Sequence, residues 1–162
     1  MRKSVLLLFV LMSAAAAVAQ SDAQKAFNTI KNMSGTWVFQ ASDGKSTDVN
    51  FKTVSAGSAV MSEIQVPNED MISMFHLDGP NKLLLTHYCA AGNQPRMVAT
   101  LSQNGKVLTF NFVDATNLET SDAAHMTRVV FTLVDDNHHT EEWTFVDHGK
   151  ERKELFDLHR KM

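Results

Sequence analysis

The chain has 162 residues, with 15 lysine and arginine side chains against 18 aspartate and glutamate side chains, and a single cysteine, Cys89. This length suits one ordinary globular domain, and the slightly acidic balance without a basic stripe argues against nucleic acid as a partner. One cysteine cannot form an internal disulfide, so packing must stabilise the fold.

The first 19 residues have the features of a secretory signal peptide. Arg2 and Lys3 supply a positive start, an apolar run follows over residues 5–12, and Ala17-Val18-Ala19 fits the small-x-small cleavage pattern. The run is shorter than the roughly 20 apolar residues that a membrane anchor needs. We therefore expect an exported protein, periplasmic or secreted, with a mature domain over residues 20–162 that has no stable membrane insertion.

One helix is predicted at the start of this domain. Ser21 and Gln24 have capping-box spacing, and Gly35 is placed to end the helix in a left-handed conformation. The apolar residues at helical intervals are Ala23, Ala26, Phe27, Ile30 and Met33. This stripe needs a surface to cover.

After Gly35 the apolar period changes to two, which predicts ten strands. They are Thr36–Gln40, Thr47–Ser55, Ala59–Val66, Met71–Leu77, Lys82–Cys89, Gln94–Gln103, Lys106–Val113, Met126–Val134, Thr140–Asp147 and Lys150–His159. Short turns such as Asn104-Gly105 separate them, and the one long connection, residues 114–125, is polar. A connection of this length suits a binding loop or lid, and equally a plain solvated loop.

Evenly spaced strands joined by short turns indicate an up-and-down meander. Closing the meander removes its exposed hydrogen-bonding edges. The predicted fold class is therefore all-β, with a single ten-stranded antiparallel up-and-down β-barrel and an N-terminal capping helix. A two-sheet sandwich is the alternative.

Alternation sorts side chains into inward and outward faces. The Asn104-Gly105 turn pairs Met97 with Phe112 and defines an apolar inward face. Carried across the preceding strands, this register sets two polar groups on opposite faces: Tyr88, Thr86 and Ser73 on one, and His76, His87 and Arg96 on the other. A bulge at Pro95 would exchange the two faces, so the pattern leaves both open.

The last strands raise a similar choice. Pairing Phe131 with Trp143 keeps large apolar groups together. A two-residue turn at His148-Gly149 would then place Arg152 and Glu154 inside as an ion pair. Because buried charges are costly, we favour a staggered hairpin that points Phe156 and Leu158 inward and leaves the two charged residues in solvent.

Met33-Ser34-Gly35-Thr36-Trp37, which follows the helix and opens the first strand, resembles the Gly-x-Trp start of lipocalins and their calycin relatives. That resemblance implies that Trp37 plugs the closed end of a calycin-like barrel. Five further segments resemble a group of exported bacterial proteins of unknown function: Phe75–Gly79, Leu85–Cys89, Asn93–Met97, Asp114–Leu118 and Glu142–Phe145. This second resemblance implies the same barrel and no known activity.

The chain lacks a Gly-x-Ser-x-Gly elbow, a His-Glu-x-x-His pair and a phosphate-binding glycine loop, so no catalytic residue is predicted and an enzyme is not favoured. His139 and Glu141 could share a strand face, but two ligands are too few for zinc, and we predict no metal and no cofactor. A histidine beside an arginine suits an anion, and apolar walls suit an acyl chain. The predicted ligand-binding residues are His76, His87, Tyr88, Arg96 and Trp143.

The expected function is to hold a small apolar or amphipathic ligand in the barrel lumen, as small barrels do. One alternative is a haem-binding barrel resembling nitrobindin, whose iron ligand is a late histidine. His159 is late in this chain, but alternation turns it away from Phe156 and Leu158, so we expect it to face outward. A second alternative is an enzyme that uses the region of His76, His87 and Tyr88.

Overall fold

The computed structural model describes residues 20–40, 44–66 and 69–161, so the signal peptide expected over residues 1–19 lies outside the described part of the chain. It has one α-helix, α1 (Asp22–Asn32), and a short 3-10 turn, η1 (Ser55–Gly57). The strands are β1 (Gly35–Gln40), β2 (Ser46–Val54), β3 (Ala59–Val66), β4 (Glu69–Leu77), β5 (Leu83–Tyr88), β6 (Gln94–Leu101), β7 (Val107–Thr116), β8 (His125–Asp135), β9 (His138–Asp147) and β10 (Lys150–Arg160). Every predicted strand is present.

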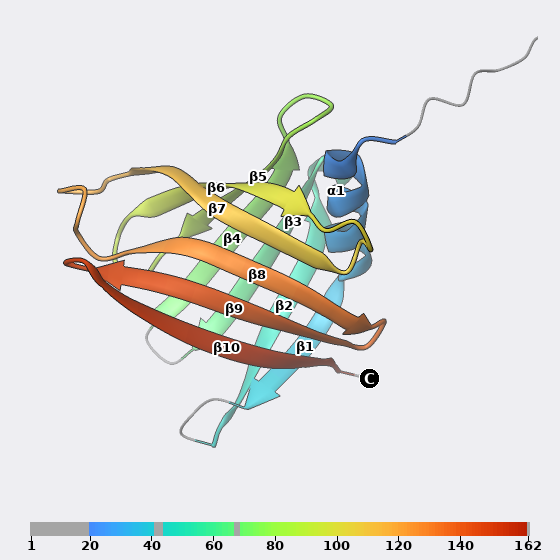
Figure 1. Cartoon of the computed structure of the whole chain (residues 1–162). Coiled ribbons are helices and arrows are strands. Elements are labelled where there is room, and N and C mark those ends of the chain that lie inside the picture. Colours follow the sequence, from blue (N-terminus) through green and yellow to red (C-terminus); the bar gives the residue numbers. More distant parts are fainter. Residues whose placement is uncertain (1–19, 41–43, 67–68, 162) are drawn as a thin grey trace, which may run out of the picture.

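The ten strands form one closed antiparallel barrel in which each strand pairs with its neighbours in sequence and β10 returns to β1 (Figure 1). The predicted barrel is therefore confirmed, and a two-sheet sandwich is not formed. The β1–β10 seam is a short ladder with the residue pairs Trp37–Arg160 and Val38–His159. No helix in the described ranges is long and apolar enough to cross a membrane.

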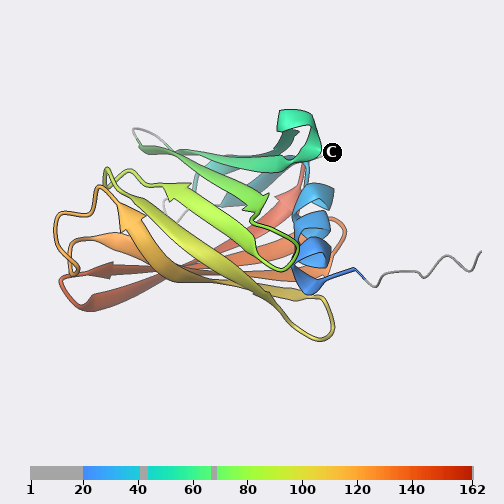
Figure 2. The same ribbon diagram turned by 90° about the horizontal axis from the view of Figure 1, so that it is seen from above.

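Helix α1 lies across one end of the barrel (Figure 2). Its N-terminus is capped as predicted, because the Ser21 hydroxyl accepts a hydrogen bond from the Gln24 backbone amide at 3.2 Å. Ala26, Phe27 and Ile30 are buried against the barrel. The C-terminus differs from the prediction: Met33 caps the helix in a right-handed conformation, and Gly35, with φ of +130°, begins β1 instead.

Trp37 fills the barrel beneath the helix. Its indole Nε1 donates to the Met33 carbonyl at 2.7 Å, and the Arg160 guanidinium lies over its ring at 4.3 Å. Arg160 also donates to the carbonyls of Ser34 and Asn32, at 2.9 and 3.1 Å. A Cβ on Gly35 would lie 2.9 Å from Arg160 Nη1, and the φ of +130° at this position also favours glycine. This closed end is consistent with a lipocalin-like fold.

The register shifts by one residue next to Pro95, between Arg96 and Met97. Met97 pairs with Phe112 as predicted, whereas Arg96 pairs with Asp114, which leaves Val113 as the bulged residue of β7. Of the two alternatives that the sequence left open, the one with a bulge next to Pro95 is therefore formed, and the extra residue lies on the strand opposite Pro95.

Neither predicted set of inward residues is correct as a whole. Leu85 pairs with Met97 and His87 pairs with Ser73, so β5 points Leu85 and His87 into the lumen and Tyr88 outward. The predicted register is off by one residue at both turns that flank β5, and the two errors cancel at β4. As a result β5 alone is turned over relative to the prediction that placed Ser73 inside.

The C-terminal strands also correct the predicted pairing. Val129 pairs with Trp143 and Phe131 with Glu141, a shift of two residues that preserves the faces. The β9–β10 turn is the two-residue form, so the predicted stagger is wrong. This turn places Arg152 and Glu154 on the face of their partners Phe145 and Trp143, as the alternative stated. Both side chains nevertheless stay exposed, as expected, while Leu158 is buried and Phe156 partly buried.

Candidate functional site

The inner face of the barrel is mainly apolar and contains a small number of polar side chains. Its closed half is completely buried, with Phe75, Leu85 and Phe110 at zero exposure. Towards the open end, inward-facing apolar side chains stay partly exposed: Met71, Met126, Phe145 and Phe156. Partly exposed apolar walls inside a barrel offer a surface that an apolar ligand can cover.

His87 is the central polar residue of the open half. Its side chain is 1 % exposed, and its Nδ1 lies 2.9 Å from the Ser73 hydroxyl, which belongs to the directly paired residue on β4. Burial lowers the pKa of the imidazole to about 4, so His87 is neutral at pH 7. Within the described ranges its Nε2 has no hydrogen-bond partner.

Trp143 meets His87 from the opposite wall. The ring centroids are 4.8 Å apart, although β5 and β9 are separated by three other strands in the barrel order. Met71 and Phe145 each lie two residues further along their strands than Ser73 and Trp143, toward the open end. The His87 site, defined as Ser73, His87 and Trp143, is therefore the floor of the open half of the lumen.

A second buried polar group, the Glu141 cluster, continues from Trp143 toward the closed end. The Glu141 carboxylate accepts from Trp143 Nε1 at 2.9 Å and lies 3.2 Å from His139 Nε2. Both side chains of this His–Glu pair are 1 % exposed. His139 packs edge-on against Trp37 at 4.3 Å, so the cluster joins the floor of the lumen to the Trp37 plug.

The structure separates the residues proposed from the sequence. His87 and Trp143 lie in the lumen, in contact with each other. His76, Tyr88 and Arg96 lie on the outer face, where Tyr88 is 48 % exposed and Arg96 forms a bidentate ion pair with Asp114 at 2.5 and 2.6 Å. The expected lumenal pair of His87 and Arg96 does not form, because β5 is turned over relative to β6.

Sequence reasoning had noted that His139 and Glu141 share a face, and the structure confirms this. It did not connect them with Trp143, although all three alternate along one strand. Ser73 was assigned to the same face as Tyr88 and therefore away from His87. The signal that could have joined Ser73 to His87 is the length of the turn between β4 and β5.

His159, the late histidine considered as a haem ligand, faces outward and its side chain is 59 % exposed. It therefore does not supply a nitrogen to the lumen, as alternation predicted.

The long polar connection is hydrogen-bonded to two turns at the open end, the one between β5 and β6 and the one between β9 and β10. Asn117 donates to the Gly92 carbonyl at 2.6 Å, Asn93 donates to the Ala124 carbonyl at 2.7 Å, and the His148 amide donates to the Asp122 carbonyl at 2.9 Å. A pocket of about 490 Å³ lies among these segments. The connection is thus tied to its neighbours rather than extended into solvent.

The hydrogen bond between Ser73 and His87 invites comparison with a serine nucleophile and its base. In such sites a third group, usually a carboxylate, bonds the other imidazole nitrogen and orients it. Here, among the described residues, Nε2 of His87 has no such partner, and a pKa of about 4 makes the imidazole a weak base at neutral pH. The geometry suits hydrogen bonding to a ligand better than general-base catalysis.

A comparison with known protein families finds no family model that matches this chain, and no curated protein resembles it closely enough to count as a relative.

Proposed function

We propose that this protein binds one small apolar or amphipathic molecule in the open half of its barrel, with His87 Nε2 as the polar anchor. The observation that carries the proposal is a nitrogen of a buried, neutral imidazole that has no hydrogen-bond partner among the described residues. A buried polar atom without a partner costs roughly 1–3 kcal/mol, and a ligand hydroxyl or carbonyl would remove that cost.

The surroundings of His87 define the chemistry of the ligand. Trp143 offers an aromatic face, and the partly exposed Met71 and Phe145 offer apolar walls above it. No lysine or arginine is among the buried side chains of the described ranges, and Arg152, whose guanidinium lies over the Phe145 ring at 5.1 Å, is exposed to solvent. The ionisable side chains buried next to Trp143 are those of Glu141 and His139. A neutral head group, such as an alcohol, ketone or ester, therefore fits this lumen better than a carboxylate.

A displacement titration tests the proposal. An environment-sensitive apolar probe with a neutral head group is bound to the protein and displaced by a long-chain alcohol and by a fatty acid of equal chain length. We expect the alcohol to displace the probe at the lower concentration. His87→Phe keeps an aromatic ring but removes the nitrogen, and should weaken alcohol binding by roughly two- to tenfold, the value of one hydrogen bond.

Tyr88→Phe is the matched control, because Tyr88 is the next residue on β5 and faces outward. It should leave alcohol binding unchanged. Absence of probe binding by the wild-type protein would refute the lumenal function, and equal binding by wild type and His87→Phe would refute the anchor.

We also propose that the protein is exported after cleavage before Gln20. The positive start, the short apolar run and Ala17-Val18-Ala19 support this proposal. Mass spectrometry of the protein from its own host should give an N-terminus at or near Gln20. An intact Met1 on a membrane-bound product would contradict export.

A further inference from the structure

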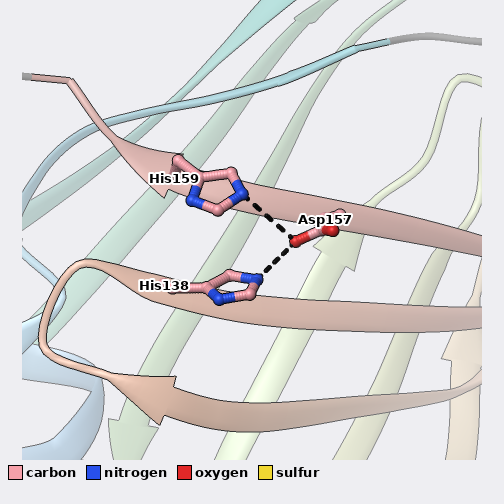
Figure 3. A group of neighbouring side chains, drawn as sticks. All are labelled: His138, Asp157 and His159. Carbon is pink, nitrogen blue, oxygen red and sulfur yellow. Dashed lines mark hydrogen bonds and ion pairs between the residues drawn. The ribbon is translucent and has the colours of Figure 1, made fainter.

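Three side chains with metal-binding atoms converge on the outer face of β9 and β10 (Figure 3). We call His138, Asp157 and His159 the outer histidine cluster. His138 Nε2 lies 2.6 Å from Asp157 Oδ1, and His159 Nε2 lies 3.6 Å from the same oxygen. The ligand atoms of all three lie within 4.8 Å of one another.

Strand register explains why these residues meet. His138 and His159 are directly paired across β9 and β10, and their rings stack with centroids 4.2 Å apart. Asp157 lies two residues from His159 on the same face, because strand side chains alternate. The residues next to them in sequence, His139 and Leu158, point into the barrel and are fully buried. The cluster is therefore set by the backbone and remains open to solvent.

We propose that the outer histidine cluster binds one divalent transition-metal ion of the zinc type. Two imidazole nitrogens and one carboxylate oxygen form a donor set that zinc accepts, leaving a fourth position for water or a partner's ligand. Two nitrogens already point at one oxygen, so the donors are aimed at a common point.

The observed distances between the donor atoms need only a small adjustment to fit a zinc ion. Donor atoms around a tetrahedral zinc ion lie roughly 3.3–3.6 Å apart, given metal–ligand distances of about 2.0–2.2 Å. The separation of 3.6 Å between His159 Nε2 and Asp157 Oδ1 already matches, whereas His138 and Asp157, at 2.6 Å, must move apart. Asp157 is 61 % exposed and is free to make that movement.

Local charge permits a cation at this position. Lys161 follows two residues after His159, but its ammonium is paired with the Asp48 carboxylate at 2.7 Å. Asp157 supplies a negative charge of its own to the cluster. A bound cation would therefore meet one uncompensated carboxylate and one lysine that is already neutralised.

The position of the cluster gives a structural consequence. His159 pairs with His138 on one side and with Val38 of β1 on the other, at the short ladder that closes the barrel. An ion held between β9 and β10 would fix His159 beside this seam. Because the three ligand residues are brought together only in the folded protein, the bound ion should raise the melting temperature.

The test is isothermal titration of zinc chloride into protein without a polyhistidine tag, compared among wild type, His159→Asn, Asp157→Asn and His148→Asn. The last variant is the matched control, because His148 is also an exposed histidine that contacts a carboxylate, Asp147 at 2.6 Å, but within the described part of the chain it belongs to no three-ligand group. Circular dichroism confirms that each variant is folded.

We expect one zinc ion per wild-type chain, an affinity at least roughly tenfold weaker in His159→Asn and Asp157→Asn, and no change in His148→Asn. Zinc should raise the melting temperature of wild type and not of His159→Asn. Magnesium should raise the melting temperature of neither protein. Absence of zinc binding by wild type, full binding by His159→Asn, or equal loss in His148→Asn would overturn the proposal.

Discussion

The two ends of the barrel use aromatic and polar side chains in different ways. At the closed end, the nitrogen of Trp37 is bonded to the Met33 carbonyl and its ring is covered by Arg160, and helix α1 lies across this end of the barrel. At the floor of the open half, Trp143 faces an imidazole nitrogen with no partner among the described residues, beneath apolar side chains that are only partly covered. The comparison indicates that the closed end supplies stability, whereas the open half retains bonding capacity that a ligand can use.

The largest expected effect is at the closed end. Trp37→Ala should lower the free energy of unfolding by about 3–5 kcal/mol, because it empties the space of a buried tryptophan and releases the support under Arg160. Urea denaturation measures this change. Leu155→Ala is a control, since Leu155 is exposed and should cost little. A loss below about 1 kcal/mol in Trp37→Ala would show that this residue is not the plug.

The next effect concerns pH and the floor of the lumen. Burial lowers the pKa of His87 from 6.5 in the unfolded chain to about 4 in the folded protein. Between these values the unfolded state binds a proton that the folded state does not, so stability falls as pH falls. The contribution of the neutral His87 imidazole to the free energy of unfolding is fully present above pH 6.5. It amounts to about 3 kcal/mol and is lost progressively as the pH falls to 4.

Urea denaturation from pH 7 to pH 4 measures this linkage, and His87→Phe removes it. The other histidines are the same in both proteins, so the difference between wild type and variant isolates His87. The variant should lose less stability on acidification than wild type. Parallel curves for the two proteins would mean that His87 is not buried as a neutral imidazole.

The smallest effect is expected on the outer face. Arg96→Ala removes an exposed ion pair with Asp114 that makes no contact with the lumen. Exposed pairs contribute little to stability, so neither the urea midpoint nor probe affinity should change measurably. A clear loss of probe binding would show that Arg96 takes part in ligand binding and would contradict the observed orientation of β6.

The strands and the capping helix were predictable because each depends on local pattern: alternation, Asn-Gly and Asp-Gly turns, and the Ser21 cap. Orientation of individual strands was harder, because a turn one residue longer reverses a face. At β5 two such errors hid the contact of Ser73 with His87. The outer histidine cluster depends on the register of β9 and β10, since His138 and His159 are 21 positions apart in sequence and adjacent only across the hairpin.

The most direct test of the lumenal account is nitrogen-15 NMR of the histidine side chains, recorded with and without a saturating long-chain alcohol. The account predicts that His87 stays neutral at pH 5.5, consistent with a pKa of about 4, and that its Nε2 resonance shifts on ligand addition while His138 on the outer face is unaffected. A His87 that titrates near pH 6.5, or an Nε2 resonance that does not move when the alcohol binds, would contradict the account.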